Sequence, residues 1–96
     1  MNENREILNP IQRDENSIKS EKNDNRHLVL YNDDINSFDY VISCLVEVCE
    51  HDIIQAEQCA FITHYKGKCD IKKGDYKKLK PLRENLVEKG LRVTID

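Results

Sequence analysis

The chain has little glycine and proline, and long apolar runs are missing altogether. Three glycines in 96 residues do not form a loop of the kind that cradles nucleotide phosphates, so nucleotide-binding enzymes built on such loops are excluded. No apolar run approaches the roughly 18 residues that a membrane-spanning helix needs. The N-terminal segment MNENREILNP also lacks the apolar centre of a secretory signal peptide. We therefore expect a cytoplasmic protein that binds no membrane.

Paired cysteines are also missing, because no two of the four cysteines form a C-x-x-C motif. The four are Cys44, Cys49, Cys59 and Cys69. Without a secretory signal, free thiols are the expected state. A zinc site drawn from Cys49, Cys59, His51 and His64 matches no structural zinc spacing. We predict neither a metal nor another cofactor.

An excess of positive charge is absent as well, since the net charge is −3 and the isoelectric point is about 5.6. These values argue against a nucleic-acid partner. The charge is nevertheless unevenly distributed along the chain. Residues 32–58 contain seven acidic residues and no lysine or arginine, whereas residues 66–83 contain eight basic residues and two acidic ones. Such a field steers a cationic ligand to one side and an acidic partner to the other, although a merely solvated surface remains the simpler reading.

The pattern of apolar residues predicts one small α+β domain. Residues 1–25 carry little apolar area, so we predict a disordered N-terminal extension there and a folded domain over residues 26–96. The domain is predicted to contain a strand at 28–31, a helix from residue 36 or 37, a helix from 53 to 66, a strand at 69–72, a third helix and a strand at 91–95. This order predicts a two-layer β-α-α-β-α-β fold, in which helices cover one face of a three-stranded antiparallel sheet.

Three local features of the helices are also predicted. In the second helix, Ile53, Ala56, Ala60 and His64 are expected to share one face, with a stop at Gly67. In the third helix, Pro81 removes a hydrogen bond to the carbonyl of residue 77. We therefore expect a kink or a separate first turn there, and a regular helix that begins near Pro81.

The segment Asn32-Asp33-Asp34 follows the first strand directly and precedes the first helix. One interpretation is a turn in which these side chains satisfy local main-chain donors. The other is a binding site, because carboxylates at the edge of an apolar pocket suit a cation attached to an apolar group, such as a free peptide N-terminus. An enzyme would need the two carboxylates and His64 as acid, base and orienting group in hydrolysis. No activated serine or cysteine accompanies them, and we predict no enzyme.

Two segments resemble the ClpS family, the adaptors that bring proteins with destabilising N-terminal residues to a Clp AAA+ unfoldase and its protease. One is the strand ending in Asn32-Asp33-Asp34, and the other is His64-Tyr65-Lys66-Gly67-Lys68, which is similar to the family's His-aromatic-x-Gly-Lys motif. Two capped helices separate them. The resemblance implies that the chain is an N-degron adaptor without enzymatic activity. A structural module like the C-terminal domain of the ribosomal stalk protein shares the topology and remains the alternative.

The resemblance also implies the site residues and partners. The α-amino group of the substrate would be held by Asn32, Asp33, Asp34 and His64. Its first side chain, expected to be Leu, Phe, Tyr or Trp, would enter a pocket made by Leu30, Tyr31, Asn36, Phe38, Val41, Ala60, Thr63 and Leu91. Phe38, Ala60 and the Asn36-Ser37 pair depart from the usual family pattern, which leaves the preference among these degrons open. The N-terminal domain of a ClpA- or ClpC-type unfoldase is the expected partner, with Lys77 and Lys78 as candidate contacts and residues 1–25 engaged during handover.

Overall fold

The computed structural model describes residues 25–96. The elements are β2 (Arg26–Tyr31), α1 (Phe38–Cys49), α2 (Ile53–Lys66), β3 (Lys68–Gly74), α3 (Tyr76–Glu88) and β4 (Arg92–Ile95). The predicted extension of residues 1–25 lies outside the described residues, except for its last position.

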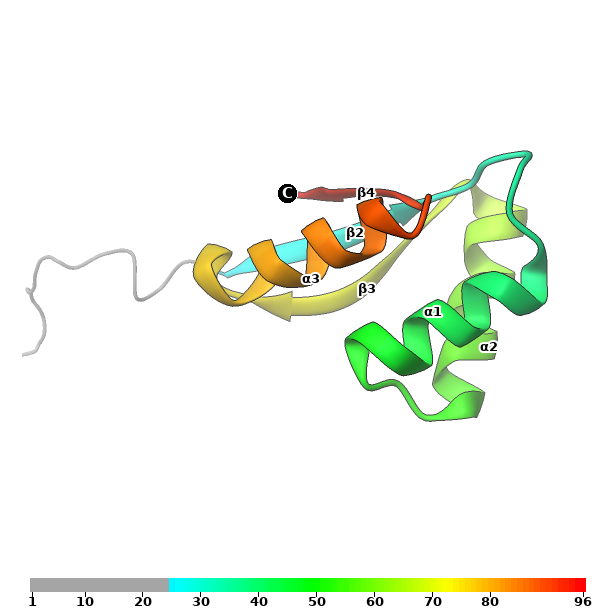
Figure 1. The fold of residues 1–96 in the computed structure, drawn as a ribbon, viewed down its shortest axis with the longest axis horizontal. Helices are drawn as coiled ribbons and strands as arrows, with labels where there is room; N and C mark the ends of the chain where they lie inside the picture. The colour runs from blue at the N-terminus through cyan, green and yellow to red at the C-terminus, as the bar shows by residue number, and fades with distance from the viewer. Residues whose placement is uncertain (1–24) are drawn as a thin grey trace, which may run out of the picture.

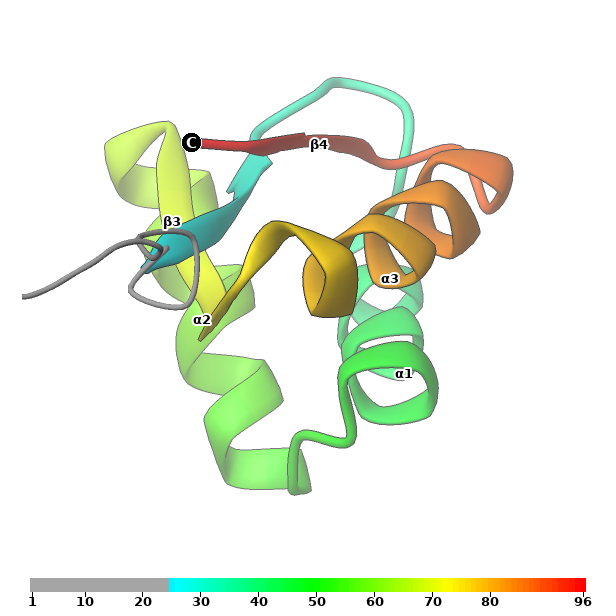
Figure 2. The ribbon, with the colours of Figure 1, turned by 90° about the vertical axis from the view of Figure 1, so that its left-hand side faces the viewer.

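The three strands form one antiparallel sheet in the order β3-β2-β4, so the first strand in the chain is the central one. Leu30 at the centre pairs with Cys69 on β3 and with Val93 on β4. The three helices cover one face of this sheet, and none of the helices of residues 25–96 lies on the other face (Figure 1, Figure 2). The predicted two-layer α+β fold is confirmed.

Each helix begins at a side chain that accepts a hydrogen bond from the first turn. The Ser37 hydroxyl accepts from the amide of Tyr40 at 3.1 Å, and the Asp52 carboxylate accepts from that of Gln55 at 2.8 Å. Asp75 does the same at the start of α3. These contacts satisfy amide groups that the helix itself leaves without a partner. At the end of α2, Gly67 has a φ of 94°, which an L side chain rarely adopts.

One of the local predictions is wrong. The third helix does not begin near Pro81, because α3 runs without interruption from Tyr76 to Glu88 with Pro81 inside it. Leu79 and Leu86, on either side of the proline, are both fully buried, and their packing compensates for the lost hydrogen bond. Along the predicted face of α2, Ala56 and Ala60 are buried, whereas Ile53 at the first helical position is 56% exposed and His64 in the last turn is exposed.

The core lies between the sheet and the helices. It contains Leu28, Leu30, Ile42, Cys44, Leu45, Val48, Cys49, Ala56, Cys59, Ala60, Ile71, Leu79, Leu86, Leu91 and Val93. Burial of this apolar area is the main source of stability for a domain of this size. Within residues 25–96, each helix is too short or too polar to cross a bilayer.

Candidate functional site

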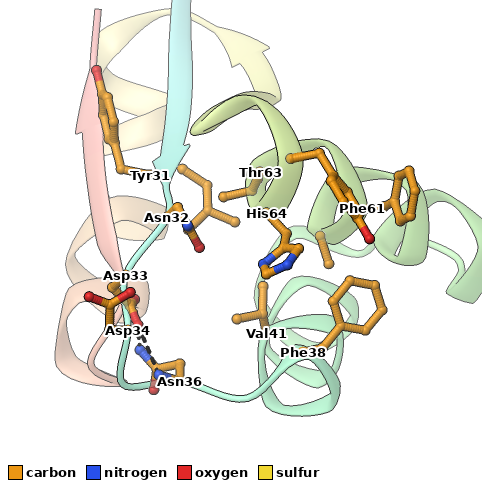
Figure 3. A pocket seen from close by; sticks show the side chains of 13 residues that line it. Tyr31, Asn32, Asp33, Asp34, Asn36, Phe38, Val41, Phe61, Thr63 and His64 are labelled. Carbon is orange, nitrogen blue, oxygen red and sulfur yellow. Dashed lines mark hydrogen bonds between the residues drawn. The ribbon is translucent and has the colours of Figure 1, made fainter.

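A cavity of about 660 Å³ opens where the end of β2 meets the end of α2. The amide of Asn32, just after the strand, donates a hydrogen bond of 2.9 Å to the carbonyl of Gly67, just after the helix. This contact brings the segment of residues 32–34 to the helical turn that carries His64. In Figure 3 the side chains of Asn32 and His64 lie on opposite sides of the opening.

Both oxygens of the Asp33 carboxylate accept hydrogen bonds from its own loop. Its Oδ1 accepts hydrogen bonds of 2.8 Å from the amides of Ile35 and Asn36, and its Oδ2 accepts one of 3.0 Å from the Asn36 side chain (Figure 3). The Asn36 side chain also donates to the carbonyl of Gly90 at 2.9 Å. The turn interpretation therefore describes Asp33 correctly. Asp33 holds the Asn36 side chain, which in turn fixes the loop against the turn between α3 and β4.

The electrostatics of Asp33 agree with this structural role. Partial burial acts to raise the pKa of Asp33, but the hydrogen bonds from Asn36 and Ile35, together with the charge of Arg92, outweigh it and lower the pKa below its usual value. Asp33 is therefore a carboxylate at neutral pH, with both oxygens already bonded.

Three polar groups at the same opening are free of such contacts. Within residues 25–96, no group hydrogen-bonds the Asn32 side-chain amide, the Asp34 carboxylate or the His64 imidazole. His64 contacts the Tyr65 ring edge-on, with ring centroids 4.9 Å apart. An amide oxygen, a carboxylate and an imidazole nitrogen are all acceptors, so the site suits a ligand with several N–H donors and a positive charge.

Apolar side chains continue the cavity inward from these acceptors. Ala60 from α2 is buried and Val41 from α1 is partly buried, whereas Phe38 and Phe61, 43% and 55% exposed, lie at the edge of the cavity. Thr63 presents no free hydroxyl, because its Oγ1 donates to the Cys59 carbonyl at 2.7 Å. The cavity thus joins a polar mouth to an apolar interior, which is the arrangement that binds an amphipathic ligand in one orientation.

The structure brings eleven of the twelve predicted site residues to this one cavity. Leu91 is the exception, because it does not line this cavity: it lies in the core, 3% exposed, where its amide donates a hydrogen bond to the carbonyl of Leu86 at the end of α3. Tyr31 borders the cavity, but its ring points away from it and toward Arg92 (Figure 3). Sequence reasoning missed Phe61 and Tyr65, which also line the cavity.

Across 25–96, histidine, cysteine and acidic side chains do not gather in any group of three or more that could hold a metal ion. His51 is buried, its Nε2 lies 2.7 Å from the Ile71 carbonyl, and it does not line the cavity.

Comparison with known proteins identifies the fold and the family. The family model described as "ATP-dependent Clp protease adaptor protein ClpS" matches residues 21–94. Among solved structures, the chain is similar to Agrobacterium tumefaciens ClpS2 bound to L-phenylalaninamide, with a TM-score of 0.65 and 19% sequence identity over 76% of this chain and 95% of that one. A search of the curated proteins finds no match. The chain belongs to the ClpS family of ATP-dependent Clp protease adaptor proteins.

Proposed function

We propose that this protein binds the free N-terminus of substrate proteins whose first side chain is large and apolar, and delivers them to a Clp AAA+ unfoldase. One observation carries the proposal. The unbonded acceptors of Asn32, Asp34 and His64 lie at the mouth of a cavity whose interior is apolar. The family is one of adaptors, and the proposed activity is binding without cleavage of a bond.

An α-ammonium group matches the mouth of the cavity. It has three N–H donors and a pKa of about 7.7 to 8.0, so it is mostly charged at neutral pH. Asn32, Asp34 and His64 together offer an acceptor to each donor. In this proposal Asp33, also expected to hold the α-amino group, supplies negative charge and a fixed loop rather than a direct hydrogen bond, because both of its oxygens are already bonded.

The same chemistry rejects an internal peptide bond. An internal amide is neutral and has a single N–H, so it would leave at least two of the acceptors at the mouth without a donor. His64 accepts a hydrogen bond only while one ring nitrogen is unprotonated. Binding by this site therefore depends on His64 remaining neutral.

The apolar interior selects the first side chain. Burying a leucine or phenylalanine side chain contributes roughly 1.5 to 3 kcal/mol. This contribution ranks Leu, Phe, Tyr and Trp above alanine as first residues. Phe38 and Phe61 flank the entrance with flat rings, which disfavours first residues that branch at Cβ.

The proposed partner is the N-terminal domain of a ClpA- or ClpC-type unfoldase, in line with the family. Lys77 and Lys78 are exposed in the first turn of α3. Figure 1 shows this turn at the opposite end of the domain from the loop of residues 32–37. An acidic surface of the unfoldase could therefore contact the lysines while a substrate occupies the cavity. The cytoplasm is the proposed location, since all four cysteines are free thiols.

The test is a titration with labelled peptides that begin in Leu, Phe, Tyr, Trp or Ala, each with a free or an acetylated N-terminus. We expect the four large first residues to bind, alanine to bind at least about tenfold more weakly, and acetylation to abolish binding. The matched variant Asn32→Ala should weaken every free peptide by a similar factor. Equal affinity for free and acetylated peptides would refute the proposal.

A further inference from the structure

A second cavity lies on the outer face of α2, beside the first one. It has a volume of about 410 Å³ and is lined by Phe38, Glu57, Gln58, Phe61 and Ile62. Phe38 and Phe61 line both cavities, so the two cavities adjoin at these aromatic side chains. The proposed α-amino site does not include Glu57, Gln58 or Ile62.

Three large apolar side chains around this second cavity are partly exposed to solvent. Phe61 is 55% exposed, Phe38 43% and Ile62 39%. The Phe61 ring packs against that of Tyr65, with centroids 4.4 Å apart, which extends the apolar surface along the helix toward His64. Contiguous apolar surface of this kind is uncommon on a small domain unless something binds there.

From this arrangement we infer that the second cavity binds an apolar side chain of the second or third residue of the same N-terminal peptide whose first residue occupies the main cavity. The inference rests on the proposed function and specifies its substrate class further. The protein would select a free N-terminus followed closely by a second large apolar residue.

The continuity of the two cavities supports this choice of occupant. Phe38 and Phe61 line both cavities, and an extended peptide advances about 3.3 Å per residue, so residues 2 and 3 are the ones that we expect to lie over these rings. A separate partner would have to approach over the same two rings that the bound peptide covers. The peptide is therefore the occupant that can fill both cavities at once.

The charge around the second cavity limits which peptide side chains we expect to bind there. Glu57 is the one charged residue among those that line it. Acidic side chains nearby, including Asp34 and Asp39, increase the negative potential of this region. A glutamate in the peptide would meet this potential without a compensating cation, whereas leucine would bury apolar area.

The experiment uses the full chain and labelled peptides with a free N-terminal leucine. Residues 2 and 3 are serine in the reference peptide, and each position in turn is changed to leucine or to glutamate. We expect leucine at one of the two positions to tighten binding at least about fivefold, because it removes an apolar side chain from water. Glutamate at that position should bind no better than serine.

Two variants of α2 make the test specific to the cavity. Ile62→Ser removes an apolar wall of the second cavity and leaves the lining of the main cavity intact. Ile54→Ser is the matched control, because Ile54 is exposed on the same helix and lines neither cavity. The preference for leucine should disappear in Ile62→Ser and persist in Ile54→Ser, with similar melting temperatures for both variants.

The outcomes separate this inference from the proposed function. If the reference peptide binds only with a free N-terminus but leucine at positions 2 and 3 gives no gain, the α-amino site stands and the second cavity is not a subsite. A gain that persists in Ile62→Ser would overturn the inference as well. If acetylated and free reference peptides bind alike, the proposed function itself fails.

Discussion

The loop of residues 32–37 and the last two turns of α2 form opposite sides of one cavity, and their polar groups are used differently. In the loop, Asp33 and Asn36 bond each other and fix the segment to the rest of the fold. On α2, His64 and the aromatic rings of Phe61 and Tyr65 lie exposed at the cavity. The difference shows that neighbouring polar residues in one motif divide into those that hold the site in place and those available to a ligand.

The adjacent carboxylates of Asp33 and Asp34 give the sharpest test of this division and the largest expected effect. Asp34→Asn removes the charge of a free acceptor, so we expect affinity for a Leu-first peptide to fall about tenfold or more with the melting temperature unchanged. Asp33→Asn places an amide donor opposite the Asn36 amide donor, which should destabilise the fold by about 1 kcal/mol.

Peptide titration and thermal unfolding of Asp33→Asn and Asp34→Asn test whether the two carboxylates have these different roles. Asp33→Asn should lose less affinity than Asp34→Asn, because only the long-range charge is removed. The division between the two residues fails if Asp33→Asn keeps full stability or if Asp34→Asn binds as well as the unmodified protein.

The role of His64 on α2 is tested by measuring peptide affinity at different pH values. An imidazole that carries a proton on both nitrogens has no lone pair for the α-ammonium group. We expect affinity for a Leu-first peptide to be several-fold weaker in acidic than in neutral solution. His64→Gln keeps an acceptor that does not titrate, so its affinity should change little. An equal fall in the variant would show that another group causes the pH dependence.

The smallest expected effect concerns Phe38, whose ring lies at the entrance of the cavity. Phe38→Ala removes a ring from the entrance, and we expect peptides that begin in isoleucine or valine to gain about threefold to tenfold in affinity. Leu-first peptides should lose affinity, since part of their apolar contact is removed. No gain for either branched first residue would mean that Phe38 does not restrict the entrance.

Much of the fold could be predicted from the sequence because its signals are local. Ser37, Asp52 and Gly67 act within one or two turns of their own positions, and each marks a helix end in the structure. Pro81 misled the prediction because the burial of Leu79 and Leu86, which keeps α3 continuous, depends on tertiary packing.

The site was predictable in part, for the same reason. The Asn-Asp-Asp segment located the cavity, but the sequence does not distinguish Asp33 from Asp34, since loop geometry decides which carboxylate meets the Asn36 amide. Leu91 was assigned by resemblance, and only the packing of α3 shows it in the core. Phe61 lies three residues before His64 on α2, so helical spacing was a signal that could have identified it.

A crystal structure of the protein with a peptide that begins in leucine tests the central claim most directly. We predict that the α-amino nitrogen lies within hydrogen-bond distance of the Asn32 side-chain oxygen, an Asp34 oxygen and a His64 ring nitrogen, with the leucine side chain between Val41 and Ala60. The bonds from Ile35 and Asn36 to Asp33 should remain. An α-amino group in open solvent, or one that displaces Asn36 from Asp33, would contradict the account.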